Sequence, residues 1–148
     1  MPFEHESVLL DEVLELLAPV SGGVYCDATL GGGGHAEKVL EASSPDGRLI
    51  GIDRDIEAIE AAKKRLEKFG DRVSILHGNY GDLESLMATA GVQKIDGLLL
   101  DLGVSSHQLD IAERGFSFMR AGPLDMRMDR SQTETASTLL SRLAEDEL

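Results

Sequence analysis

The stretch DATLGGGGHAEKVL, residues 27–40, decides the fold of this chain. Four consecutive glycines, Gly31 to Gly34, separate an apolar segment that runs into Asp27 from a segment with helical spacing. Residues without Cβ permit positive φ and let a ligand approach the main chain, and the start of the following helix offers free N–H groups. A strand, a glycine loop and a helix in this order indicate a nucleotide-type ligand, with a simple turn as the alternative.

On both sides of this stretch, apolar strand-like segments alternate with helix-like segments. In chain order, the predicted strands and helices cover residues 24–30, 34–42, 48–53, 55–69, 72–78, 82–90 and 95–103. Near-continuous apolar strands joined by helices are typical of a parallel sheet covered on both faces, and right-handed crossovers make such a sheet doubly wound. The predicted fold class is α/β, a Rossmann-like doubly wound parallel sheet that is incomplete in this chain.

Two further regions flank the alternation. Residues 7–18 place Leu9, Val13, Leu16 and Leu17 on one helical face, which predicts an amphipathic helix ahead of the first strand. Residues 103–130 are rich in glycine and polar residues and show no periodic segment, whereas residues 134–148 have helical character again.

Length and composition indicate one globular domain. The chain has 148 residues, of which 42% are hydrophobic and 28% charged. No apolar run reaches the roughly 18 residues of a membrane span, and the acidic N-terminal stretch does not resemble a signal peptide. Cys26 is the only cysteine, which excludes an intrachain disulfide, and we expect it to pack in a buried strand. We therefore expect a soluble, cytoplasmic protein without contact to a membrane.

The net charge of −13, from 27 acidic and 14 basic residues, is unsuited to nonspecific binding of nucleic acid. Such binding rests on Lys and Arg side chains that neutralise phosphates. If the substrate is a nucleic acid, its contacts must be local or be supplied by other parts of the machinery.

The carboxyl ends of the predicted strands, where ligands bind in a doubly wound sheet, all carry polar residues. The first strand leads into the glycine loop, the second ends in Asp53, the third leads into HGNYGD, and the fourth carries Asp101. Asp53 follows Gly33 at about the 20-residue distance at which an acidic residue accepts hydrogen bonds from a ribose. An N-cap or a solvated charge is the alternative for Asp53. The polar residues at the ends of the four predicted strands together favour an adenosine-type ligand.

Two adenosine-containing cofactors compete for this loop. Gly31, Gly33 and Ala36 satisfy the dinucleotide fingerprint, which would make the protein an NAD-type oxidoreductase. That fingerprint uses the helix terminus for a pyrophosphate, however, and here Asp27 stands before the glycines, where it suits a ligand with an ammonium group. S-adenosylmethionine has an adenosine, an amino acid end and no phosphate, so it fits Asp27, the loop and Asp53 better.

Several longer motifs follow one another along the chain from His5 to about Arg130, namely HESVLLDE, DATLGGGGH, GIDRD, DGLLLDLGVSSHQLD, ERGFSFM and GPLDMRMD. These motifs resemble those of the RsmH (MraW) family. Members of that family are S-adenosylmethionine-dependent enzymes that methylate the exocyclic N(4) amine of a cytidine in small-subunit (16S) ribosomal RNA.

The resemblance implies a cofactor site. It implies that Asp53 holds the ribose, that Tyr80 lies against the adenine, and that Asp101 and Gln108 lie at the reactive side. Tyr80 suits stacking on a purine, with a half-buried aromatic that closes the sheet as the alternative. The implied cofactor residues are Gly33, Gly34, His35, Asp53, Tyr80, Asp101 and Gln108.

Two of these residues have further interpretations. Asp101 is our catalytic candidate, because a hydrogen-bond acceptor at the cytosine amine would rehybridise it and receive its proton; a cofactor role alone or a structural role is the alternative. The His35 ring is expected to donate to the cofactor or to cap the helix. No pair of histidines has metal-ligand spacing, so no metal is predicted.

The target base needs aromatic or apolar walls once it has left its stack. Phe116, Phe118 and Met119 could form such walls, or they could be a plug that anchors the loop. The arginines of the same region are matched by acidic residues, so internal ion pairing is expected for them.

The resemblance also implies a division of the chain. Residues 1–130 correspond to the N-terminal part of the methyltransferase domain, and residues 131–148 to the truncated start of a helical insertion. A fragment of this kind is expected to keep the cofactor pocket and to be catalytically weak. The implied partner is small-subunit ribosomal RNA or the 30S particle, and a homodimer is left open. A non-catalytic nucleotide-binding or assembly module is the remaining alternative.

Overall fold

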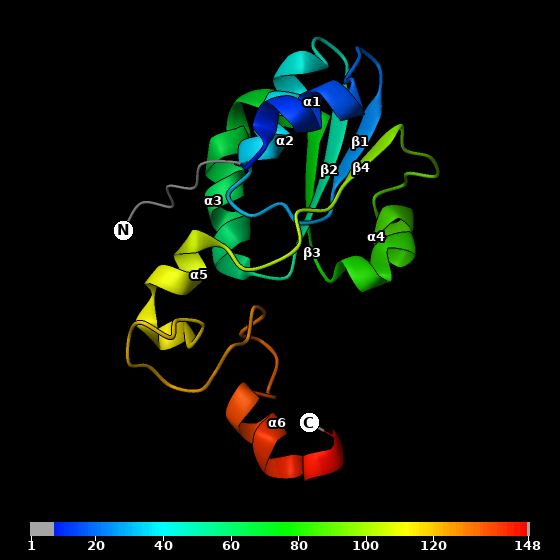
Figure 1. The fold of residues 1–148 in the computed structure, drawn as a ribbon. Helices are drawn as coiled ribbons and strands as arrows, with labels where there is room; N and C mark the ends of the chain where they lie inside the picture. Colours follow the sequence, from blue (N-terminus) through cyan, green and yellow to red (C-terminus); the bar gives the residue numbers. More distant parts are fainter. Residues whose placement is uncertain (1–7, 148) are drawn as a thin grey trace. The chain divides into compact units, whose positions relative to one another are not determined.

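The computed structural model describes residues 8–147 of the chain (Figure 1). These residues form two compact units, one that reaches to Leu102 and one that begins at Gly103. The domain division expected from the sequence lies later, at residue 130, and the assignment of 131–148 to an insertion stays a prediction.

The first unit alternates helices and strands, as expected. Its elements are α1 (Leu10–Leu17), β1 (Val24–Asp27), α2 (Gly34–Ala42), β2 (Arg48–Asp53), α3 (Ile56–Leu66), β3 (Val73–His77), α4 (Leu83–Thr89) and β4 (Gly97–Leu99). Two short 3-10 helices join them, at Glu67–Arg72 and Tyr80–Asp82. The second unit contains α5 (Ser106–Asp110), α6 (Ala136–Arg142) and 3-10 helices at Ala112–Arg114 and Glu145–Glu147.

The four strands form one parallel sheet in the order β3-β2-β1-β4. In the register, Cys26 of β1 pairs with Ile50 of β2 on one side and with Leu98 of β4 on the other. The first three strands add outward from β1 in one direction and β4 lies on its other side, so the order of the chain reverses between β1 and β4. This confirms the predicted Rossmann-like parallel sheet.

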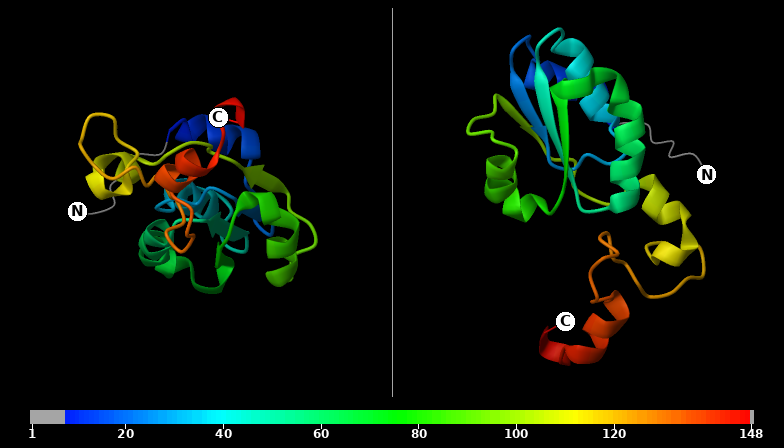
Figure 2. Two further views of the ribbon diagram at one scale, coloured as in Figure 1. Left: turned by 90° about the horizontal axis from the view of Figure 1, so that it is seen from below. Right: turned by 180° about the vertical axis from the view of Figure 1, so that it is seen from behind.

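Helices cover both faces of the sheet (Figures 1 and 2). Successive strand residues point to opposite faces, so Tyr25 and Leu49 join one hydrophobic cluster, with side chains of α1, α2 and α3. Cys26 and Ile50 join the other cluster, which α4 covers with Met87 and its neighbours. Each strand of the pair β1–β2 is therefore apolar on both sides, which is why its sequence reads as a continuous apolar run.

Cys26, the only cysteine, is 1% exposed at the centre of the sheet. Burial, with a smaller contribution from the neighbouring charge of Asp27, raises the pKa of its thiol to about 12. The expectation of a packed cysteine is confirmed.

Several boundaries differ from those expected. The predicted strands 24–30 and 95–103 form sheet pairs only over Val24–Asp27 and Gly97–Leu99, because beyond these residues the backbone turns into the loops of the carboxyl edge. Helix α3 ends at Leu66, and the rest of the predicted segment 55–69 continues into a 3-10 helix.

The expected core face of the first helix was wrong in two positions. Leu9 is 63% exposed and Leu16 is 87% exposed. Leu17 packs against the core as expected, and Leu14, which was not expected there, packs beside it. The helix begins only at Leu10, and Leu14 and Leu17, three residues apart, lie on the same side and set its buried face.

Residues 103–130, which show no periodic segment in the sequence, nevertheless contain a helix. This region holds α5, a helix too short for periodicity to reveal it. Residues 134–148 do contain a helix, α6, but it ends at Arg142 and a 3-10 turn follows.

Candidate cofactor site

The carboxyl edge of the sheet is the geometric centre of the candidate site. In a doubly wound sheet, ligands bind outside the carboxyl ends of the strands at the point where the strand order reverses. Here that point lies between β1 and β4. Asp27 ends β1, Asp53 ends β2, and Asp101 follows β4 after one residue. Three carboxylates are thus carried to one edge by strands that share a register.

The glycine loop after β1 has the backbone that its sequence predicts. Gly31 and Gly33 have φ of 51° and 81°, in the left-handed region that other residues avoid. A Cβ on Gly33 would also lie 3.3 Å from Cδ1 of Leu66, a buried side chain of α3. Gly33 is the N-cap of α2, and no side chain caps this helix. The loop therefore turns sharply and presents main chain at the start of α2.

Asp53 ties the end of β2 to the glycine loop. Its Oδ2 accepts a hydrogen bond from the Gly31 N–H at 2.8 Å, and its Oδ1 accepts one from the Asp55 N–H at 2.8 Å. Burial raises the pKa of this carboxyl above its usual value, although these backbone donors oppose the shift. Each carboxylate oxygen has a second lone pair, so Asp53 can also accept hydrogen bonds from a ligand hydroxyl. The helix N-cap that we considered for Asp53 is supplied instead by Asp55, which accepts from the Glu57 N–H.

Asp27 is a buried acid, with 2% of its surface exposed. Its Oδ1 accepts a hydrogen bond from the Thr29 N–H at 3.1 Å. Burial raises the pKa of this carboxyl to about 6; the nearby Asp53 charge adds to the rise, and the Thr29 contacts and His35 oppose it. A nearby cation would favour the ionised form, so this acid is suited to a positively charged ligand group.

His35 makes a contact that sequence reasoning missed. Its buried ring places Nε2 at 2.9 Å from the carbonyl oxygen of Val8. A carbonyl only accepts, so Nε2 carries the proton and donates it. The ring therefore connects the chain before α1 to the first turn of α2, and the suggestion that it caps the helix was wrong. Contact of His35 with the cofactor stays a prediction.

Tyr80 and Asp101 are the two exposed members of the predicted set in the first unit. Tyr80 is 44% exposed and opens the 3-10 helix after β3, where the Asn79 side chain accepts from the Gly81 N–H. This exposure leaves part of the ring for stacking and equally fits a half-buried aromatic that closes the sheet, so the stacking role of Tyr80 stays a prediction. The Asp101 side chain is also exposed, and its backbone N–H donates to Oγ1 of Thr29 at 2.7 Å.

Gln108 lies in the second unit, whereas the other predicted residues lie in the first. It is buried on α5, where its Oε1 accepts from the Ser105 N–H at 3.1 Å. The Gln108 N–H donates in return to Oγ of Ser105 at 3.2 Å, which completes a capping box. The spacing Ser-x-x-Gln is a signal for such a helix start, and it was readable in the sequence. The cofactor role of Gln108 stays a prediction.

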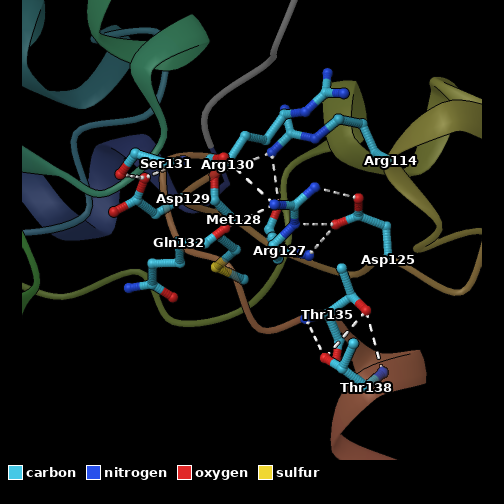
Figure 3. A network of polar contacts seen from close by, with 10 residues as sticks. All are labelled: Arg114, Asp125, Arg127, Met128, Asp129, Arg130, Ser131, Gln132, Thr135 and Thr138. Atoms are coloured by element: carbon cyan, nitrogen blue, oxygen red, sulfur yellow. Dashed lines mark hydrogen bonds and ion pairs between the residues drawn. The ribbon is translucent and has the colours of Figure 1, made fainter.

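Polar contacts organise the chain after α5 (Figure 3). The guanidinium of Arg114, 1% exposed, donates to the carbonyl oxygens of Arg127 and Met128 at 3.2 and 3.1 Å. Arg127 donates to both carboxylate oxygens of Asp125 at 2.8 and 2.7 Å. This pairing holds the pKa of the Asp125 carboxyl down at about 2. The expected internal ion pairing of the arginines is confirmed for Arg127.

The apolar residues of the same region are not buried as a plug. Phe118 is 93% exposed and Met119 is 83% exposed, whereas Phe116 is partly buried. The plug interpretation is therefore wrong for Phe118 and Met119, and their role as walls for a base stays a prediction.

Other features of the described residues bear on ligands. A groove of about 480 Å³ lies beside the first turns of α1 and α2, and of the predicted cofactor residues it includes Gly34.

Within residues 8–147, no His, Cys, Asp and Glu side chains gather in a group of three or more that could hold a metal ion. No helix in this part of the chain is long and apolar enough to cross a membrane.

Comparison with known sequences gives a consistent result over the whole chain. A sequence model of the MraW methylase family matches residues 2–148. Ribosomal RNA small subunit methyltransferase H from Citrifermentans bemidjiense is 60% identical over 146 residues, 99% of this chain and 47% of that protein. The protein of the same name from Geobacter sulfurreducens is 55% identical over 148 residues, 100% of this chain and 48% of that protein. The chain spans about half the length of these curated relatives.

Solved structures share the fold at low sequence identity. NSun6 from Pyrococcus horikoshii, solved with SFG, has a TM-score of 0.56 at 19% identity, covering 74% of this chain and 27% of that one. A putative rRNA-methylase from Clostridium thermocellum has a TM-score of 0.53 at 20% identity, covering 70% of this chain and 57% of that one. These similarities support the Rossmann-like fold.

Proposed function

This chain belongs to the MraW methylase family, and from that premise we propose that it binds S-adenosylmethionine. We further propose that it takes part in transfer of the methyl group to the exocyclic N(4) amine of a cytidine in small-subunit (16S) ribosomal RNA. The observation that carries the proposal is the joint placement of the glycine loop, Asp27, Asp53 and Asp101 at the carboxyl edge of a family-matched sheet.

The described residues fit this cofactor better than a dinucleotide. Asp53 retains acceptor capacity for ribose hydroxyls while it holds the loop at Gly31. Asp27 places a buried carboxylate beside the loop, where weak screening favours a cationic amino acid end over a pyrophosphate. Tyr80 has an exposed ring that suits stacking on adenine. No side chain caps α2, so the N–H groups at its start are left for other partners, although Gly33 itself is buried.

The residues at the end of β4 are the proposed reactive side. Bound S-adenosylmethionine supplies an electrophilic methyl group on a sulfonium. The cytosine amine is a poor nucleophile because its lone pair is delocalised into the ring. An exposed carboxylate such as that of Asp101 can accept a hydrogen bond from this amine, concentrate its lone pair on nitrogen and receive the proton that leaves. Positioning of the two reacting atoms supplies most of the remaining rate enhancement.

The proposed partner is small-subunit ribosomal RNA or the 30S particle, in the cytoplasm. The net charge of −13 supports recognition through local contacts, because a general attraction to phosphates would need an excess of basic residues. Phe118 and Met119 expose apolar surface that suits an unstacked base. A homodimer stays a prediction.

Calorimetric titration with S-adenosylhomocysteine and with NAD tests the cofactor. We expect binding of S-adenosylhomocysteine and none of NAD. Asp53→Ala should weaken the binding by about 1 to 3 kcal/mol, because charge-assisted hydrogen bonds to the ribose are lost. Asp46→Ala is a matched control, since Asp46 is an exposed acid in the turn between α2 and β2, at the amino edge of the sheet.

Unchanged affinity of the Asp53→Ala variant would remove Asp53 from the site. Binding of NAD in place of S-adenosylhomocysteine would support the oxidoreductase alternative and contradict the proposed function.

A further inference from the structure

The segments that follow β1 and β4 are joined by a side chain just beyond the last paired residues of the two strands. The ladder between these strands ends at the pair Asp27 and Leu99, followed by one hydrogen bond from the Ala28 N–H to the Leu99 carbonyl at 3.0 Å. Continued by two residues, the same register would bring Thr29 opposite Asp101. There the Asp101 N–H donates to Oγ1 of Thr29 at 2.7 Å, so a hydroxyl replaces a backbone acceptor.

The hydroxyl of Thr29 has a defined orientation because both of its roles are occupied. Its oxygen accepts from the Asp101 N–H, so its own hydrogen must point elsewhere. Oδ1 of Asp27 lies 3.5 Å from the hydroxyl oxygen, in reach of this hydrogen, and also accepts from the Thr29 N–H at 3.1 Å. The buried acid of β1 thereby fixes Thr29, and Thr29 fixes the main chain at Asp101.

We propose that Thr29 is a positioning residue that sets the backbone of Asp101 across the point where the strand order reverses, and so places the Asp101 side chain toward the cofactor. The inference rests on the proposed function, because it gives Asp101 a ligand to face. Thr29 itself acts through Asp101 and does not touch the ligand.

The hydrogen bond between Asp101 and Thr29 lies where the pairing of the strands has already ended. Strand β4 is only three residues long, so its paired backbone ends before Asp101 is reached. Asp101 is therefore held by something other than the sheet ladder. The hydroxyl of Thr29, two residues beyond the end of β1, does this.

A set of variants of this chain, titrated with S-adenosylhomocysteine, tests the inference. Thr29→Val keeps the branched shape and removes the hydroxyl, and it should weaken binding about tenfold, the equivalent of one hydrogen bond. Thr29→Ser keeps the hydroxyl and should bind within about twofold of the unchanged chain. Asp101→Ala should weaken binding by a similar factor, and Thr29→Val combined with Asp101→Ala should be no weaker than Asp101→Ala alone.

Amide hydrogen exchange at Asp101 tests the bridge independently of the ligand. Thr29→Val should speed this exchange about tenfold and Thr29→Ser should restore it. Thr89→Val is the matched control, because it removes an exposed threonine hydroxyl that donates to the Ser85 carbonyl on α4. It should change neither readout.

Unchanged exchange at Asp101 in Thr29→Val would overturn the inference, as would additive losses in the double variant or a Thr29→Ser variant as weak as Thr29→Val. Failure of the proposed function gives a different pattern. The unchanged chain would then not bind S-adenosylhomocysteine, or Asp53→Ala would bind it equally well, whatever the exchange at Asp101.

Discussion

The two units of the chain are stabilised in different ways. In the described residues, the buried hydrophobic side chains all lie in the first unit, between Tyr25 and Met87. The buried side chains of the second unit are polar, namely those of Gln108 and Arg114. Its exposed apolar groups include Phe118 and Met119. The first unit is thus organised by an apolar core and the second by directional polar contacts.

This difference indicates how each unit responds to substitution. Hydrophobic burial is non-directional and sums over many contacts, so it stabilises the whole sheet and the loops that it carries. A hydrogen bond contributes less in net terms, but removing one partner leaves the other group buried without compensation. We therefore expect global effects from core substitutions in the first unit and local effects from polar substitutions in the second.

The largest expected effect is that of Leu66→Ala. Leu66 is fully buried and packs against Gly33 of the glycine loop, so its truncation leaves a cavity beneath the candidate site. Urea unfolding should show a loss of about 3 to 4 kcal/mol in the free energy of unfolding. The same substitution at Leu140, half exposed on α6, should cost less than about 0.5 kcal/mol. Equal losses at the two leucines would contradict the difference between the units.

The next effect depends on pH and concerns Asp27. Its pKa is about 6 when folded and its usual value is 3.8, so the folded state binds this proton more tightly than the unfolded state. The stabilisation that follows is complete below the unfolded pKa and is lost as the pH rises through about 6. At neutral pH the buried charge therefore costs about 3 kcal/mol relative to acid pH.

Asp27→Asn removes this titration and keeps an acceptor for Thr29. As the pH rises from about 4 to about 7.5, the free energy of unfolding of the variant should increase relative to that of the unmodified chain, by up to about 3 kcal/mol. Urea unfolding of both proteins at each pH measures this difference. A difference that does not change with pH would contradict burial of the ionised acid.

The smallest of the three effects concerns Arg114 in the second unit. Arg114→Met keeps much of the aliphatic stem and removes the donors to the Arg127 and Met128 carbonyls. Opening of this segment should become easier by about 2 kcal/mol, measured by amide exchange of residues 125–130, with little change in the exchange of β1 and β2. Arg142→Met is the control, because Arg142 pairs with Glu134 at the surface. Faster exchange throughout the sheet would show that the polar network supports both units.

Much of the first unit was predictable because its signals are local. Helix α2 and strand β2 have the predicted bounds, since the glycine loop, the apolar run and the turn that precedes Arg48 mark them directly. The position of Asp53 at the end of β2 follows from the same run. The choice of buried face on α1 was wrong at Leu16 because a short helix offers several apolar stripes, and only packing selects one.

The missed features of the site depend on contacts that spacing does not contain. The His35 ring reaches the Val8 carbonyl, and the Thr29 hydroxyl receives the N–H of Asp101, 72 residues later in the chain. Both pairs are set by how elements pack and by the register between β1 and β4. Helix α5, in contrast, had a local signal in Ser105 and Gln108, which a search for capping boxes would have found.

The buried thiol of Cys26 gives the chain a reporter of its own opening. A thiol with a pKa of about 12 in the middle of the sheet is almost entirely protonated and shielded, so alkylating reagents react with it only when β1 separates from its neighbours. No second cysteine competes for the reagent. The labelling rate of the unmodified protein therefore follows the population in which the strand that carries the glycine loop is exposed. A ligand that binds at the carboxyl ends of β1 and β4 should slow that labelling in proportion to its occupancy.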